Sequence, residues 1–290
     1  MKYSISATLL TFAASALLSS ALPVQEKRLF GSDTADGMSD VLLGDENCKD
    51  MAVIFARGTF DSGNIGVWVG PQFKAALESR IPSLAFQGVE AADYPATLGT
   101  YLGEDGGSDT GAASLAAMVA DYVNFCPKST VVVSGWSQGA RVAHKALALM
   151  TPKVRAKVAG LAVFGDPHAL FSSDPVPKGI AFHSECFTGS LLDPLCSKLP
   201  GDFKFPTSIA DITGPFSALP GLVSGAEEAK AAASLVLRFP GQLLSARKAF
   251  TDALTDTSKM QRLLLSPQHF MYGNKGLTGK AADFVAGLKK

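Results

Sequence analysis

Short apolar runs alternate with segments of helical periodicity along most of the chain. The apolar runs are rich in β-branched residues and predict strands at 51–56, 85–89, 130–135, 158–164 and 180–182. The segments between them predict helices at 71–80, 114–125 and 138–150. Runs such as Val131-Val132-Val133 are continuous rather than alternating, as expected for strands buried on both faces of a parallel sheet. The pattern therefore predicts an α/β fold, a three-layer α/β/α sandwich around a mostly parallel central sheet.

One stretch, from about residue 197 to 262, breaks this alternation. Five prolines surround an alanine-rich run that predicts a helix from Ala226 to Leu237, and the stretch has no strand pattern. It also carries many aromatic and branched side chains, and so much apolar surface does not stay solvated on its own. We therefore expect a helical insertion that packs on the α/β domain.

The first residues have the pattern of a secretory signal peptide. Lys2 precedes a mostly apolar stretch that ends in the small residues Ser19-Ser20-Ala21, as a signal peptidase requires. Leu22-Pro23 and the charged residues after it argue against a continuous buried helix, and the dibasic pair Lys27-Arg28 suggests the end of a propeptide. We expect a signal peptide over 1–21, a propeptide over 22–28, one domain over 29–290, and a secreted, extracellular protein.

Composition agrees with a single compact domain and narrows the range of partners. The chain of 290 residues is 47% apolar and 18% charged, as is usual for a well-packed globular protein. Its 26 basic and 26 acidic residues cancel, and no run of five like charges occurs, so we expect no binding to nucleic acid. No later segment is apolar over the roughly 20 residues of a membrane span, so we expect no transmembrane anchor. We expect a monomer.

The cysteines favour disulfides over a metal site. Four are present, an even number in a chain with a predicted secretory signal, namely Cys48, Cys126, Cys186 and Cys196. None of their spacings is Cys-x-x-Cys, and the histidines form no metal-binding motif. We therefore expect two disulfides and no metal.

A candidate nucleophile lies in Gly135-Trp136-Ser137-Gln138-Gly139, which matches Gly-x-Ser-x-Gly. The motif follows a predicted strand and opens a predicted helix, the strand-turn-helix context in which the turn is so tight that glycines flank the serine. The same turn directs the Gln138 backbone N–H toward a reacting carbonyl, as half of an oxyanion hole. We therefore predict Ser137 as a catalytic nucleophile rather than a serine that merely occupies a βα turn.

A serine hydroxyl is a weak nucleophile at neutral pH and needs a histidine base and an orienting carboxylate. His269 is the last histidine and has a loop-like setting, whereas His144, His168 and His183 lie on or beside predicted helices and strands. Asp193 is the preferred acid because a disulfide-closed loop would hold its carboxylate rigidly. Asp166, in Gly165-Asp166-Pro167 after a strand, is the alternative, and it is equally interpretable as a turn or cap residue.

The chain resembles the fungal cutinase family along most of its length outside the insertion. The resemblance is carried by these motifs: Ala56-Arg57-Gly58-Thr59, Gly63-Asn64-Ile65-Gly66, Tyr94-Pro95-Ala96-Thr97-Leu98-Gly99, Gly135 to Ala140, Phe164-Gly165-Asp166-Pro167, the Cys186 to Cys196 loop and His269-Phe270-Met271-Tyr272-Gly273. It implies an α/β-hydrolase fold of cutinase type and hydrolysis of carboxylic esters without a cofactor.

The resemblance also assigns roles to residues. It implies a catalytic triad of Ser137, Asp193 and His269 and an oxyanion hole of Thr59 and Gln138. For the cysteines it implies two disulfides, Cys48 to Cys126 and Cys186 to Cys196.

This chain departs from the family in the acid loop. The family loop usually reads Cys-x-x-Gly-Asp-x-x-Cys, but here Gly189 is followed by Ser190. Counting back from Cys196 places Asp193 at the acid position, whereas counting from Cys186 places Ser190 there, and a serine cannot act as a carboxylate.

Two further departures lie around the oxyanion hole and the histidine. The family's acidic-Asn pair that supports the oxyanion loop is replaced by Thr100-Tyr101, so we expect different support for Thr59. Cys196 and His269 are 73 positions apart, where the family has a short segment.

We interpret the chain as a secreted serine esterase that acts on cutin-like polyesters or acyl esters, and whose partner is an ester substrate, either soluble or at a polymer or lipid surface. A lipase, an acetylxylan-type esterase, and a catalytically weak wall-binding or surface-binding protein on a hydrolase scaffold are the alternatives. The insertion is expected to be either a partial lid over Ser137 or a remote packing appendage.

Overall fold

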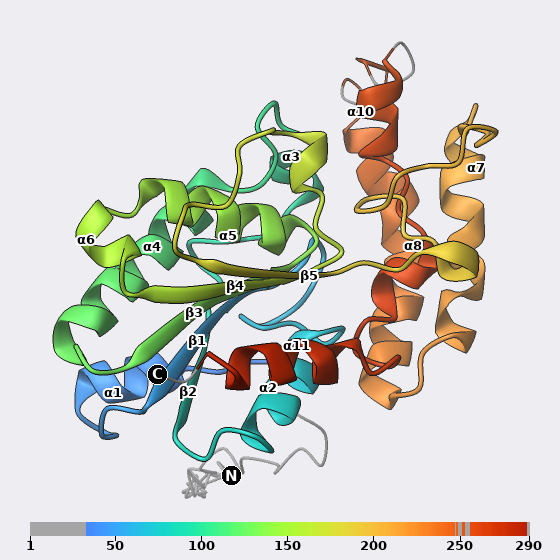
Figure 1. Ribbon diagram of the computed structural model, residues 1–290. Helices are drawn as coiled ribbons and strands as arrows, with labels where there is room; N and C mark the ends of the chain where they lie inside the picture. Colours follow the sequence, from blue (N-terminus) through green and yellow to red (C-terminus); the bar gives the residue numbers. More distant parts are fainter. Residues whose placement is uncertain (1–32, 247, 249–250, 253–255, 289–290) are drawn as a thin grey trace, which may run out of the picture.

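A five-stranded parallel sheet forms the centre of the computed structural model, which describes residues 33–290 except 247, 249–250, 253–255 and 289–290 (Figure 1). The strands lie in the order β2-β1-β3-β4-β5. Their bounds are β1 Met51–Ala56, β2 Leu84–Gly88, β3 Thr130–Trp136, β4 Val158–Phe164 and β5 Ala181–Glu185. All five predicted strands are therefore confirmed, with ends shifted by at most a few residues. The predicted signal peptide and propeptide lie outside the described residues.

Helices cover both faces of the sheet and make the two outer layers (Figure 1). On one side lie α1 (Gly37–Leu43), α4 (Asp109–Phe125), α5 (Gln138–Leu149) and α6 (Pro152–Arg155). On the other side lie α2 (Gly70–Glu78) and α11 (Leu277–Ala286). Each layer packs its own apolar cluster against the sheet, so β1 is buried along its whole length, as its unbroken apolar run predicts.

Short elements lie at one end of the sheet, three of them after a strand and one, η4, after the insertion. They are α3 (Leu98–Tyr101), η1 (His168–Leu170), η2 (Gly189–Leu191) and η4 (Pro267–Phe270). Because the strands are parallel, the segments after β1, β3, β4 and β5 all emerge at the carboxyl edge of the sheet. This edge brings together the segments that carry Thr59, Ser137, Asp166 and Asp193.

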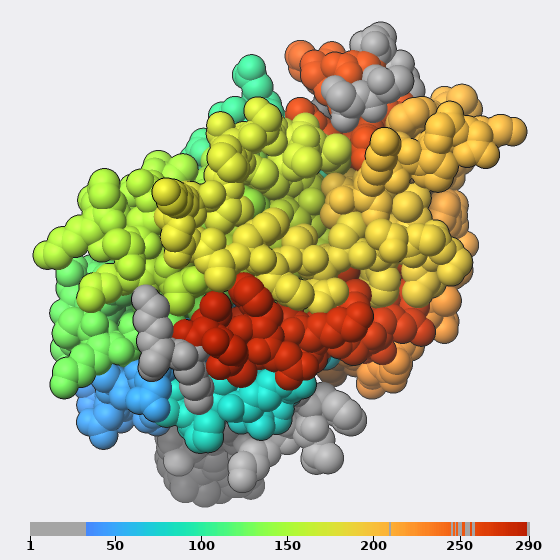
Figure 2. Space-filling model, viewed as in Figure 1, coloured from blue at the N-terminus to red at the C-terminus, as the bar shows by residue number. Residues whose placement is uncertain are grey.

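The insertion is helical in its described part, as predicted. It contains α7 (Ile209–Thr213), η3 (Gly214–Gly221), α8 (Ala226–Ser245) and α10 (Thr257–Gln261), which stand beside the end of the sheet (Figure 1). In Figure 2 this yellow-orange to orange segment lies directly against the body of the molecule. The alanine-rich helix is longer than predicted because it continues through Pro240 to Ser245. Phe239 and Leu243, on either side of this proline, are buried, and their packing offsets the backbone hydrogen bond that proline cannot make.

The two ends of the insertion meet. The side-chain amide of Gln261, at the end of α10, donates to the carbonyl oxygens of Pro194 and Ser197, at 2.8 and 3.3 Å. The next residue, Arg262, donates from Nε and Nη2 to the carbonyl oxygen of Leu170. The chain therefore leaves the α/β domain and returns to it at nearly the same place.

Both disulfides are present in the structure. Cys48–Cys126 ties the segment before β1 to the end of α4, and Cys186–Cys196 closes the loop that contains Asp193. The acid loop is thus a small covalent ring. In the described part of the chain, no helix combines the length and apolar character needed to span a membrane.

Candidate active site

Ser137 occupies a tight turn between β3 and α5. Its backbone has φ 58° and ψ −126°, a region that residues with a side chain seldom adopt. A Cβ atom on Gly135 would collide with the backbone of Gly139, and a Cβ on Gly139 would collide with the carbonyl of Ala56. The two flanking glycines are therefore required by close backbone contact, as the motif predicts.

Asp193 and His269 are joined by a hydrogen bond in the interior. Nδ1 of His269 lies 2.7 Å from Oδ2 of Asp193, and the two side chains are 1% and 0% exposed. The backbone is held as well, because Nε1 of Trp136 donates to the His269 carbonyl oxygen at 3.1 Å and the two rings stack. With Nδ1 engaged by a carboxylate, Nε2 is the ring nitrogen left to accept a proton. Nε2 is buried and has no hydrogen-bond partner among the described residues.

The Asp193 carboxylate is stabilised in its charged form. Burial alone raises its pKa, but His269 and hydrogen bonds from the Tyr272 hydroxyl and the Leu195 amide outweigh burial, so the pKa lies below its ordinary value. The Tyr272 hydroxyl donates to Oδ2 at 2.6 Å. Burial, followed by the charge of Asp193, raises the pKa of Tyr272, so this hydroxyl keeps its proton and remains a donor.

Asp166, the alternative acid, binds a different histidine. Its Oδ2 lies 2.8 Å from Nε2 of His144, and its Oδ1 accepts from the backbone amide of His168 at 2.9 Å. The rings of His144 and His168 stack with centroids 3.8 Å apart. Asp166 therefore caps the turn after β4 and belongs to a separate cluster. Among the two carboxylates considered from the sequence, Asp193 is the one in contact with His269.

The side chain of Gln138 connects the loops around Thr59. Its Nε2 donates to the Thr97 carbonyl oxygen at 2.8 Å and to Oγ1 of Thr59 at 3.1 Å, and its Oε1 accepts from the Thr100 hydroxyl at 3.2 Å. A carbonyl oxygen only accepts, so the contact with Thr97 fixes which end of the amide is the NH₂ group. The Thr59 oxygen must then accept from Gln138, which leaves the Thr59 proton to donate elsewhere. Thr100, one of the two residues at the Thr100-Tyr101 departure, thus contributes its hydroxyl to the network that holds Thr59.

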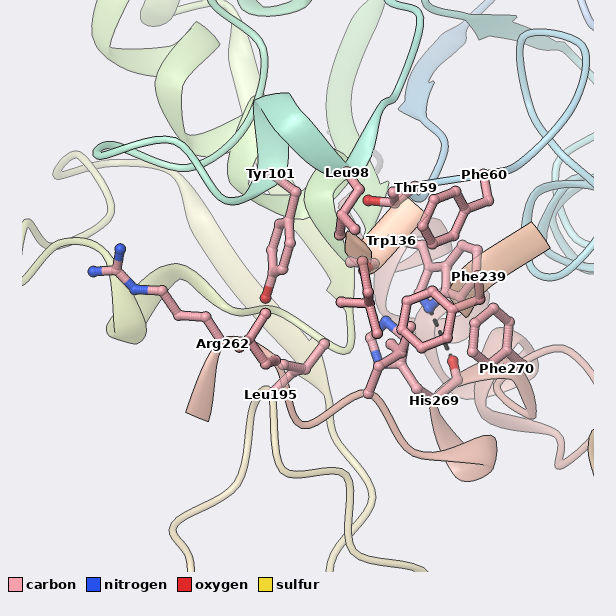
Figure 3. A pocket seen from close by; sticks show the side chains of 14 residues that line it. Thr59, Phe60, Leu98, Tyr101, Trp136, Leu195, Phe239, Arg262, His269 and Phe270 are labelled. Atoms are coloured by element: carbon pink, nitrogen blue, oxygen red, sulfur yellow. Dashed lines mark hydrogen bonds between the residues drawn. The ribbon is translucent and has the colours of Figure 1, made fainter. Parts of the chain in front are cut away.

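One pocket brings three of the five predicted site residues together (Figure 3). Thr59, Ser137 and His269 all line it, and it leaves about 410 Å³ of empty space, part of which is open to solvent. Ser137 is only 5% exposed, so its surroundings restrict access to the hydroxyl. Most of the lining from the α/β domain is apolar, namely Phe60, Leu98, Tyr101, Trp136, Leu195 and Phe270.

The insertion contributes to the same pocket. Phe239 and Leu243 of α8 line it, followed in the chain by Arg262, Leu263 and Leu265. The Phe239 ring contacts Phe60, next to Thr59, at a centroid distance of 5.8 Å, and Phe216 of η3 at 4.8 Å. Phe216 in turn contacts Phe270, beside His269. The inner face of α8 therefore closes the space between the Thr59 loop and the histidine turn.

Two features of this site were not predicted from the sequence. Tyr272 lies three residues after His269 within a motif that was recognised, but only the fold shows that its hydroxyl reaches Asp193. The contacts of the Gln138 side-chain amide were not predicted either, because the motif predicts a role for the backbone N–H of this residue and says nothing about its side chain. No group of three histidine, cysteine or acidic side chains in the described ranges is arranged to bind a metal ion.

The chain matches known proteins over a large part of its length. The Cutinase family profile matches residues 47–203. The cutinase of Botryotinia fuckeliana is 40% identical over 129 residues, which are 44% of this chain and 61% of that protein. Cutinase CUT1 of Coprinopsis cinerea is 34% identical over 203 residues, which are 69% of this chain and 88% of that protein.

Similar solved structures include two from Trichoderma reesei. A cutinase in complex with a C11Y4 phosphonate inhibitor is 26% identical, with a TM-score of 0.42, over 69% of this chain and 85% of that chain. The catalytic core domain of an acetyl xylan esterase is 21% identical, with a TM-score of 0.39, over 48% of this chain and 83% of that chain. The family profile covers more than half of the sequence, and the Coprinopsis relative is matched over most of its length. This chain belongs to the cutinase family and is a carboxylic ester hydrolase.

Proposed function

We propose that the protein is a secreted serine esterase in which Ser137, His269 and Asp193 act as a triad. The observation that carries the proposal is the pocket shared by Ser137 and a histidine whose Nδ1 lies 2.7 Å from a buried carboxylate. In the first step Nε2 of His269 takes the proton of Ser137 as Oγ attacks the ester carbonyl, and His269 then protonates the departing alcohol. Water, activated by His269, hydrolyses the acyl-enzyme and restores Ser137. Asp193 holds the ring in the productive tautomer and stabilises the imidazolium.

The proposed oxyanion hole combines Thr59 and the backbone N–H of Gln138. Negative charge develops on the carbonyl oxygen in both steps, and donors already in place stabilise it without reorganisation. The hydrogen bond from Gln138 Nε2 to Thr59 Oγ1 supports this role, since it leaves the Thr59 proton as a donor. No cofactor enters this chemistry.

The substrate is proposed to be an ester with an apolar acyl group rather than an acetylated polysaccharide. The support is the lining around Ser137, which is mostly leucine and aromatic side chains from the α/β domain and from α8. Binding in such a pocket is stabilised by about 0.8 kcal/mol for each methylene group of the acyl chain that it buries. An acetyl group has no methylene and would use little of that surface.

Secretion is proposed on two grounds. Residues 1–21 have the sequence pattern of a signal peptide, and both disulfides require an oxidising compartment to form and persist.

An alkyl p-nitrophenyl phosphonate tests the serine mechanism directly. It should attach to one residue with loss of p-nitrophenolate, and peptide mass mapping should place the adduct on Ser137. Prior treatment with the probe should abolish hydrolysis of p-nitrophenyl butyrate. If the folded protein is neither labelled nor hydrolytic, the serine mechanism is wrong and a binding protein on a hydrolase scaffold is the better interpretation.

Gln138→Glu is expected to lower kcat by about 10²-fold to 10³-fold with little change in KM, the range seen when one oxyanion donor is lost. The substituted carboxylate cannot donate, so the Thr59 hydroxyl would donate to it and turn away from the oxyanion. Steady-state kinetics with p-nitrophenyl butyrate measures the effect. Gln138→Met is the matched control, because it removes the amide without capturing the Thr59 proton, and its loss of kcat should be smaller. Equal losses in both variants would argue against the orientation of Thr59 as the cause.

Phe239→Ala tests whether the insertion is a partial lid. Removing this ring opens the space between Phe60 and Phe216. The ratio of kcat/KM for p-nitrophenyl dodecanoate to kcat/KM for p-nitrophenyl butyrate should therefore rise about tenfold. A single methylene in a tight pocket changes kcat/KM by about tenfold or more. Leu237→Ala is the control on the same helix, because Leu237 is 82% exposed. An unchanged ratio in both variants would favour a packing appendage.

A further inference from the structure

The hydroxyl of Tyr101 is buried beside the active site without a partner. Tyr101 ends α3, is 5% exposed and lines the same pocket as Ser137 and His269. Its hydroxyl oxygen has no hydrogen-bond partner among the described residues. The ring is held in place by an edge-on contact with Phe171, with centroids 5.5 Å apart. The unpartnered oxygen is therefore held in a defined place rather than on a mobile side chain.

An unpartnered buried hydroxyl destabilises the fold relative to a phenyl ring of the same shape. Nearly all buried polar groups in proteins have a hydrogen-bond partner, and exceptions call for a partner from outside the chain or a functional reason. A buried water typically needs about three polar partners. The pocket around Tyr101 offers few, because its lining is mostly leucine and phenylalanine. A polar atom carried in by an apolar substrate does not need several partners, because the rest of the molecule holds it there.

The chemistry of the hydroxyl specifies what it can bind. Burial, followed by the negative charge of Asp193, raises the pKa of Tyr101 above its ordinary value, so the hydroxyl keeps its proton. It is therefore a donor that matches an acceptor oxygen. Figure 3 shows Tyr101 and Arg262 on one side of the pocket, opposite Phe60, Phe239 and Phe270. The Arg262 guanidinium points away from the pocket and donates to the Leu170 carbonyl oxygen, so on this side the Tyr101 hydroxyl is the donor that faces the apolar rings.

We propose that the Tyr101 hydroxyl donates a hydrogen bond to an oxygen on the acyl chain of the substrate, so that this site selects esters of oxygenated acyl groups over plain alkyl esters. The proposal rests on the proposed function, since the acyl group is placed by its bond to Ser137. It assigns Tyr101 a role in specificity that Ser137, His269 and the oxyanion donors do not have.

A series of esters of equal size tests this assignment. The p-nitrophenyl ester of hexanoic acid is compared with its 3-oxa, 4-oxa and 5-oxa analogues, in which one methylene is replaced by an ether oxygen that only accepts. For at least one position, the ratio of kcat/KM for the oxa ester to that for the hexanoate should be about tenfold higher in the wild type than in Tyr101→Phe, the loss expected for one hydrogen bond. The readout is this ratio rather than either rate alone, because Tyr101 lines the pocket and the ratio cancels any effect of the substitution that both esters share.

Tyr122→Phe is the matched control. Tyr122 is also buried, but it lies in the core on the opposite face of the sheet, where its oxygen accepts from the backbone amide of Lys49 at 3.4 Å. This variant should leave every ratio unchanged. Urea unfolding separates a role in specificity from a structural role. Tyr101→Phe removes no hydrogen bond among the described residues, so it should not lower the free energy of unfolding.

Each outcome bears on one hypothesis. If the phosphonate probe labels Ser137 and Tyr101→Phe leaves the ratio unchanged at all three positions, the role of Tyr101 is wrong while the serine mechanism stands. If the wild type is neither labelled nor active, the proposed function itself fails.

Discussion

Ser137→Ala is expected to lower kcat for p-nitrophenyl butyrate by about 10⁴-fold to 10⁶-fold, because no other group in the proposed mechanism forms the acyl-enzyme. Alanine removes only the hydroxyl oxygen and fits the same turn, so the fold should persist. Hydrolysis rates and phosphonate labelling measure the loss. Near-native activity in this variant would mean that another residue is the nucleophile.

Ser134→Ala is the matched control for that experiment. Ser134 lies three residues earlier on β3, and its hydroxyl donates to the carbonyl oxygen of Ala162 in the core. Its loss should reduce the free energy of unfolding by about 1 kcal/mol and leave kcat nearly unchanged. A comparable loss of activity in both variants would indicate damage to the strand rather than to the chemistry.

Asp193→Asn is expected to lower kcat by about 10⁴-fold. The asparagine NH₂ group can occupy the position facing Nδ1 of His269, which would place the ring proton on Nε2, where it blocks removal of the serine proton. The rate of p-nitrophenyl butyrate hydrolysis at neutral pH measures the loss. The Cys186–Cys196 ring should keep the loop in place in this variant, so circular dichroism should show an unchanged fold.

Asp166→Asn is the control carboxylate. Asp166 contacts His144 and the backbone of His168 rather than His269, so its loss should cost about 1–3 kcal/mol of stability and change kcat only a few-fold. If Asp166→Asn abolishes activity and Asp193→Asn does not, Asp166 is the catalytic acid.

The sheet was predictable because each strand has a strong local signal. The continuous apolar runs of β1, β3 and β4 indicate strands buried on both faces of the sheet. In a parallel sheet the carboxyl ends of all strands lie at the same edge. The position of Ser137 followed from the glycines around it, since a turn this tight excludes side chains on both sides. Helix α8 was predicted too short because Pro240 is a strong local stop signal, whereas the burial of Phe239 and Leu243 depends on tertiary contacts.

The contact of Asp193 with His269 and the unpartnered hydroxyl of Tyr101 were harder to predict, because both depend on contacts between segments far apart in the sequence. Counting within the acid loop left Asp193 and Ser190 in competition, and only the three-dimensional distance to His269 separates Asp193 from Asp166. The unpartnered hydroxyl of Tyr101 has no sequence signal, because a lack of hydrogen bonds is a property of everything packed around it.

The meeting of the insertion's two ends at Gln261 makes it an exchangeable module. Asp193 is held before the insertion by the Cys186–Cys196 ring, and the backbone of His269 is held after it by Trp136, so groups of the α/β domain hold both positions. Doubling the length of a flexible loop costs only about 0.6 kcal/mol in closure entropy. We therefore expect that exchange of this one segment, in evolution or by grafting, changes the access of substrates to Ser137 while Asp193 and His269 stay in place.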